Sequence, residues 1–186
     1  MRKLFLFAAL TLALPIIAQA QDSPRTEIFG GYSYLRLDED LNDDRDLNGY
    51  NASVNQTIFK KWLAFKADFS GHFGDSVVTL GPGTDLNKFL FLFGPQFTLR
   101  RYERIQPFAH VLVGAARINV NNDTTGLDFD DTSFAFAAGG GVDVKVADRV
   151  AVRLFQADYV LTRFGDTNQH NFRASGGFVL RFGSVD

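Results

Sequence analysis

Residues Leu63–Phe73 read LAFKADFSGHF, and apolar and polar side chains alternate through this stretch. In an extended chain successive side chains point to opposite faces, so one face carries four large apolar residues with Ala67 and Gly71, and the other carries Lys66 and Asp68. A charged side chain against lipid near the midplane costs about 2–4 kcal/mol, whereas inside a closed barrel it can pair with an opposite charge. The stretch therefore predicts a membrane-spanning strand whose polar face lines a lumen.

The same period of two recurs along the rest of the chain. It is clear in Thr132–Val146 and in residues 171–182, and weaker in Arg25–Leu37, Leu47–Ile58, Lys88–Arg100, Gln106–Arg117 and Val150–Thr162. Beyond residue 20 no apolar run approaches the roughly 20 residues that a membrane helix needs. The pattern predicts an all-β protein, an eight-stranded antiparallel up-and-down transmembrane β-barrel.

Two places interrupt the alternation. Arg153 and then Gln156 and Asp158 face the lumen together only if a bulge near Phe155 shifts the phase by one residue. Proline removes a ladder hydrogen bond, so we also expect a bulge at Gly94-Pro95.

The N-terminus has the features of a secretory signal peptide. Arg2 and Lys3 precede an apolar stretch, and Ala18-Gln19-Ala20 provides the small residues of a cleavage site. We expect residues 1–20 to be removed and residues 21–186 to form the barrel domain. Removal leaves 17 basic against 21 acidic side chains, which indicates no nucleic-acid partner, and the chain has no cysteine.

The connections between the expected strands alternate in length. Longer polar stretches cover residues 38–46, 75–87 and 118–131, and tight turns lie at residues 59–61, 101–105 and 147–149. Bacterial barrels place short turns in the periplasm and longer loops outside. Aromatic residues near the expected strand ends, which could form interfacial girdles, are Tyr34, Trp62, Tyr102 and Tyr159.

The lumen of an eight-stranded barrel is only wide enough for side chains to fill it, so we expect a polar core of paired groups. The residues expected in this lumen charge network are Glu27, Lys66, Asp68, Arg100, His110, Asp143, Lys145, Arg153, Asp158, Arg173 and Arg181. A gated ion or proton path through the same residues is the alternative.

Several motifs resemble one family of membrane proteins. Residues 27–34 (EIFGGYSY), 91–95 (FLFGP), 107–110 (PFAH) and 156–159 (QADY) are similar to the small porin-family outer-membrane β-barrel proteins, the relatives of outer-membrane protein A and of the opacity proteins. The resemblance implies a bacterial outer-membrane location, contact with lipid and lipopolysaccharide, and handling by the outer-membrane assembly machinery. The expected assembly signal is Gly177, Leu180 and Phe182, although Gly183–Asp186 follow the final aromatic residue.

Some barrels of this size modify lipid A, so catalysis needs a test. The candidate groups are His72 with Asp75 or Ser76, and His170 with Ser133, but no adjacent His-Ser pair occurs in the sequence. We predict no catalytic, cofactor or metal site.

The acidic stretches of the sequence are the only candidates for binding a metal ion. Asp44-x-Asp46-x-Asn48-Gly49 begins like a calcium loop, but Asn55 stands where a glutamate is required. The alternative is weak binding of divalent cations by residues 38–46 and by the cluster Asp128, Asp130 and Asp131.

Function is therefore expected to be structural or surface-interacting, with the acidic external loops as the interaction surface and an unknown ligand. The alternative is a narrow channel or a lipid-A-modifying enzyme.

Overall fold

The computed structural model describes residues 24–38, 45–59, 61–75, 84–102, 104–122, 127–164 and 167–184. The expected signal peptide, residues 1–20, lies outside them. No helix within these ranges is long and apolar enough to cross a membrane.

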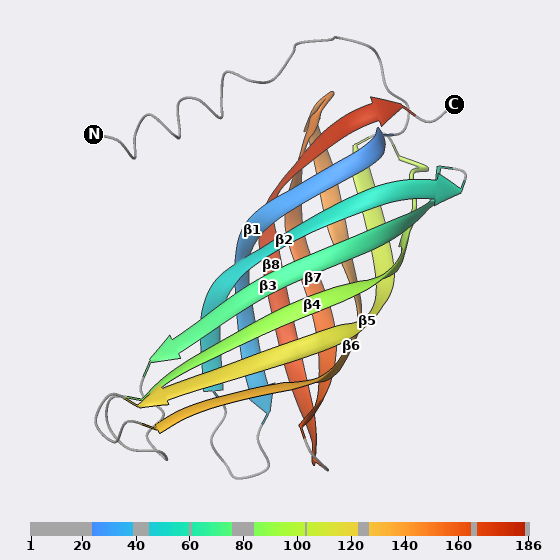
Figure 1. Cartoon of the computed structure of the whole chain (residues 1–186). Helices are drawn as coiled ribbons and strands as arrows, with labels where there is room; N and C mark the ends of the chain where they lie inside the picture. Colours follow the sequence, from blue (N-terminus) through green and yellow to red (C-terminus); the bar gives the residue numbers. More distant parts are fainter. Residues whose placement is uncertain are drawn as a thin grey trace, which may run out of the picture.

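Eight antiparallel strands form one closed barrel in which each strand pairs with the next and β1 pairs with β8 (Figure 1). The strands are β1 Pro24–Asp38, β2 Arg45–Phe59, β3 Leu63–Asp75, β4 Thr84–Thr98, β5 Ile105–Asn122, β6 Leu127–Ala147, β7 Val150–Phe164 and β8 Thr167–Ser184. The predicted fold is confirmed. Pro24 and Ser184 are paired, so the first and last strands meet at the end with the short turns.

Burial alternates along the strands as the sequence pattern predicts. In β3 the ring of Phe65 is 45% exposed, whereas Lys66 and Asp68 are 0% and 3% exposed. Because the barrel wall is one sheet thick, an exposed side chain here faces the membrane and a buried one faces the lumen.

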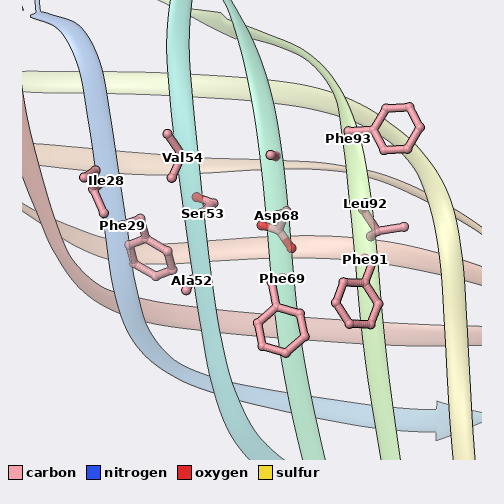
Figure 2. Close-up of a pocket in the computed structure, with 11 residues that line it drawn as sticks. Ile28, Phe29, Ala52, Ser53, Val54, Asp68, Phe69, Phe91, Leu92 and Phe93 are labelled. Carbon is pink, nitrogen blue, oxygen red and sulfur yellow. The ribbon is translucent and has the colours of Figure 1, made fainter.

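The membrane face over β1–β4 is largely aromatic. Phe69 and Phe91 lie across the β3–β4 pair with ring centroids 4.8 Å apart. The small residues Ala52 and Ala67 are in the wall of an apolar hollow of about 420 Å³. Figure 2 labels Ala52 together with its larger neighbours Val54, Phe69 and Phe91.

The predicted bulge in β7 is confirmed. Arg153 pairs with Gly177 and Gln156 pairs with Ser175, so Leu154 and Phe155 together face one residue of β8. Both bulge side chains are exposed to the membrane side, at 62% and 55%. The extra residue returns Gln156 to the lumen face that Arg153 occupies.

The predicted bulge at Gly94-Pro95 is wrong. Pro95 stays in register with Phe65 of β3, and the β4–β5 register before and after Gly94 and Pro95 is the same. Neither residue is paired with β5, because proline has no N–H to donate to that neighbour. The missing donor interrupts one ladder locally without adding a residue.

The expected loop over residues 118–131 is mostly strand. β5 continues to Asn122 and β6 begins at Leu127, and these residues pair with each other. About 9–11 residues suffice for a strand to cross the membrane, so the 21 residues of β6 extend beyond it. Pairing of β6 with β7 starts only at Phe134, so the β5–β6 hairpin continues past the last β7 pair.

Candidate functional site

Arg173 of β8 is the centre of the charge network in the lumen. Its guanidinium donates to Asp158 Oδ2 at 2.7 and 2.9 Å and to Asp68 Oδ1 at 2.7 Å. The same group donates to Ser70 Oγ at 3.0 Å. One fully buried arginine therefore joins β3, β7 and β8 across the lumen.

The two carboxylates have further partners on other strands. Lys66 Nζ lies 3.2 Å from Asp68 Oδ2, and Asn51 donates to Asp68 Oδ1 at 3.0 Å. His110 Nε2 lies 2.8 Å from Asp158 Oδ1, and Gln156 donates to Asp158 Oδ2 at 2.7 Å. Each of these two buried carboxylates thus faces an opposite charge and at least one neutral hydrogen-bonding group, as burial of ions requires.

Arg153 forms a second pair beside this cluster. It binds Asp143 through two donors, with N···O distances of 2.8 and 3.1 Å, in the two-point geometry that suits a guanidinium and a carboxylate. The rings of Phe29 and Phe108 each lie 4.3 Å from its Cζ. A third bond, to Gln156 Oε1 at 2.7 Å, connects the pair to the Arg173 cluster.

A third group closes the lumen near the short turns. Glu27 Oε1 lies 3.3 Å from Arg100 Nη2 and 3.0 Å from Arg181 Nε. Gln106 Oε1 accepts from both arginines, at 3.0 and 2.7 Å.

Ten of the eleven residues expected in the network lie in these three groups, and Lys145 does not. Lys145 is at the end of β6, where the β6–β7 register shifts, and its ammonium lies 3.1 Å from Asp148 in the adjoining turn. Alternation stops predicting the facing of a side chain where a strand passes into a turn.

Two buried titratable residues were missing from the expected network. Lys88 is fully buried and donates to Thr162 Oγ1 at 3.3 Å. His72 was considered only as a catalytic candidate; it is buried, and its Nε2 lies 2.9 Å from Ser33 Oγ. Each is an even number of residues from an inward-facing polar residue on its own strand, Lys88 from Gln96 and His72 from Ser70. The alternation of the sequence could therefore have placed both in the lumen.

The lumen is polar in only part of its length, which corrects the expected polar core. Leu35, Leu37, Leu47 and Leu86 form a buried cluster toward the ends of the strands that carry the longer connections. A second apolar cluster lies next to it and contains Leu90, Leu92, Leu112, Ala116, Ala135, Ala137 and Val160. Inward leucines on β1, β2, β4 and β5 thus fill much of the lumen toward the longer connections, and the buried Lys88 lies on β4 between Leu86 and Leu90.

Of the two expected catalytic pairings, only that of His170 with Ser133 lies within the described side chains, and these two residues form no hydrogen bond. His72 contacts Ser33, while the side chains of Asp75 and Ser76 lie outside the described residues. His170 is exposed and contacts the hydroxyl of Tyr159, whereas Ser133 lies on β6. The described part of the chain holds no cluster of three or more potential metal-binding side chains.

Comparison with protein families gives a match over most of the chain. The model of the outer membrane protein β-barrel domain matches residues 6–182. The chain belongs to this family. It is therefore an outer-membrane β-barrel protein of bacteria, surrounded by lipid and lipopolysaccharide. A comparison with the sequences of curated proteins finds no match.

Several solved outer-membrane barrels share the fold at low sequence identity. Neisserial surface protein A is 17% identical with a TM-score of 0.66, over 84% of this chain and 97% of that one. The attachment invasion locus protein Ail of Yersinia pestis is 14% identical with a TM-score of 0.59, over 85% and 99%. OprG of Pseudomonas aeruginosa is 10% identical with a TM-score of 0.55, over 90% and 100%.

Proposed function

We propose that this family member is a non-conducting barrel that presents its external surface for interaction and carries out no catalysis. The filled lumen is the observation that carries the proposal. Three ion-paired groups occupy its periplasmic and central parts, and two leucine-rich clusters occupy its external part.

Conduction would require both the ion-paired groups and the leucine-rich clusters to move aside. Leu35, Leu90 and Leu112 are 0% exposed, so these side chains are packed in this part of the lumen. Arg173 would also have to release two carboxylates inside a low-dielectric wall, and an uncompensated buried charge costs several kcal/mol.

The external surface supports an interaction role with a positively charged partner. Residues 38–46 include six acidic residues and one arginine, and the β5–β6 hairpin extends beyond the membrane. On that hairpin Arg117 donates to Asp130 at 2.8 Å and holds the pKa of the Asp130 carboxyl below its usual range. The related Ail barrel was solved with the heparin analogue sucrose octasulfate, a polyanion. The acidic surface of this chain favours a basic partner instead.

The serine–histidine contact in the lumen does not supply a nucleophile that substrates can reach. Ser33 and His72 are both buried, and Ser33 Oγ also lies 2.9 Å from Ser175 Oγ. A catalytic pair of this kind needs a carboxylate to orient the histidine, and within the described residues His72 Nδ1 has no hydrogen-bond partner.

We also propose that the end of β8 is read by the assembly machinery, which adds a strand at an open edge. Leu180 faces the membrane, where a partner could contact it. A larger residue does not fit at position 177, since a Cβ there would lie 2.4 Å from the carbonyl oxygen of Gly30. Packing is therefore a separate reason for glycine at this position.

Conductance and lipid analysis test the proposed function. The purified mature protein in planar bilayers should give no steady openings, and lipid A from a deletion strain should keep its acylation pattern. Steady openings would favour the channel, and altered acylation would favour an enzyme. A matched variant, Leu112→Ser, should raise the frequency of brief openings if the leucine layer is the barrier.

A further inference from the structure

The membrane face has an apolar hollow beside two short turns. It has a volume of about 490 Å³, and its wall includes Trp62, Phe97, Leu99, Pro107 and Ala109. Trp62 stacks on Phe97 with 5.8 Å between ring centroids and an interplanar angle of 15°. Trp62, Phe97 and Leu99 are each about half exposed, so the hollow opens toward lipid.

The two turns beside this hollow are joined by hydrogen bonds. Trp62 O accepts from Thr98 N at 2.8 Å, and Lys61 O accepts from Arg100 Nε at 2.9 Å. The β2–β3 turn and the β4–β5 turn are therefore held together at the short-turn end of the barrel. The relative position of the two turns is therefore fixed by hydrogen bonds to backbone carbonyl groups.

Exposed basic side chains lie on both turns. Lys61 precedes Trp62 on one turn, and Arg101 and Arg104 lie on the other. Within the described residues none of the three forms an ion pair, although Glu103, outside those residues, follows Tyr102 in the same turn. The short turns at residues 60–61, 100–104 and 148–149 carry six basic and two acidic residues, the reverse of the acidic external stretches.

We propose that this corner of the barrel binds a phospholipid with an anionic head group in the periplasmic leaflet. Lys61 and Arg101 would hold the phosphate, and one acyl chain would lie in the hollow between Trp62 and Pro107. Charge complementarity and the position at the membrane boundary favour this occupant, because aromatic and basic residues together mark the head-group level of a membrane. A protein partner would not require a hollow that faces the hydrocarbon.

Native mass spectrometry with two phospholipids of equal chain length tests the proposal. The detergent-solubilised mature protein should retain phosphatidylglycerol in preference to phosphatidylcholine. Each basic residue near an anionic lipid contributes about fivefold, so the variant Lys61→Gln with Arg101→Gln should weaken phosphatidylglycerol retention about 25-fold at low salt. Trp62→Ala should weaken the retention of both phospholipids.

Arg36→Gln with Arg163→Gln is the matched control, because both arginines are exposed on the membrane face at the opposite end of the barrel. It should leave the preference unchanged. Heat resistance of the folded band on gels should be the same for all variants, which shows that each is folded. Equal retention of the two phospholipids by the wild type, or an unchanged preference in the Lys61/Arg101 variant, would overturn the proposal. So would co-sedimentation with peptidoglycan sacculi that depends on these two residues without any phospholipid preference.

Discussion

Replacing Arg173 with methionine tests the energetic role of the central cluster. The substitution removes two ion pairs and leaves the carboxylates of Asp68 and Asp158 buried in the lumen. Breaking a buried pair from one side typically costs 3–5 kcal/mol. Asp68 keeps Lys66 at 3.2 Å and Asp158 keeps His110 at 2.8 Å, so we expect the lower end, about 3 kcal/mol.

Urea unfolding in phospholipid vesicles, followed by the fluorescence of Trp62, measures this loss, because the chain has one tryptophan. The double variant Arg173→Met, Asp158→Asn removes one charge of each sign and leaves Asp68 paired with Lys66, so it should recover most of the free energy of unfolding. Arg163→Met, at an exposed position, should change it by less than about 0.5 kcal/mol. An Arg173→Met barrel as stable as the wild type, or a double variant less stable than the single one, would refute the reasoning.

Three further predictions concern the lumen layer, the membrane face and the bulge. Leu112→Ala should lower the free energy of unfolding by about 2–5 kcal/mol in the same titration, because it leaves a cavity among buried apolar side chains. Phe65→Arg should lower the free energy of unfolding by about 2–4 kcal/mol, and Phe65→Leu is the near-neutral control. Equal urea midpoints for the two variants would contradict a membrane-facing Phe65. Deleting Leu154 removes the bulge but keeps the inward phase on both sides of it, so the folded, heat-resistant band should persist. Deleting Ala157 turns Gln156 or Asp158 toward lipid and should abolish that band.

The alternation of apolar and polar residues was sufficient to predict the fold. In β3 the predicted facing of Phe65, Lys66, Asp68 and Phe69 agrees with the structure, because a charge cannot stay against lipid at low cost. The β7 bulge was predictable for the same reason, since only an extra residue lets Arg153 and Asp158 share one face. Facing is a local property, and a local pattern is enough to predict it.

Partners within the lumen were not predictable. Arg173 binds Asp68, 105 residues away in sequence, and the contact depends on how far each strand is shifted when the barrel closes. The inward leucines were missed because the alternation separates membrane from lumen and does not say how polar each level of the lumen is. At Pro95 the sequence predicted a bulge that the structure lacks, since a missing N–H donor can interrupt the hydrogen bonds between two strands without an extra residue.

Spin labelling along β3 tests the central claim most directly. The chain has no cysteine, so single nitroxide labels can be placed through Ala64→Cys, Phe65→Cys, Phe69→Cys and Ser70→Cys, and their collision rates with oxygen measured in vesicles. Labels at 65 and 69 should have the high oxygen accessibility of the hydrocarbon region, and those at 64 and 70 should have low accessibility. Equal accessibility at all four positions, or the reverse alternation, would contradict a barrel with its aromatic face in lipid and its charges inside.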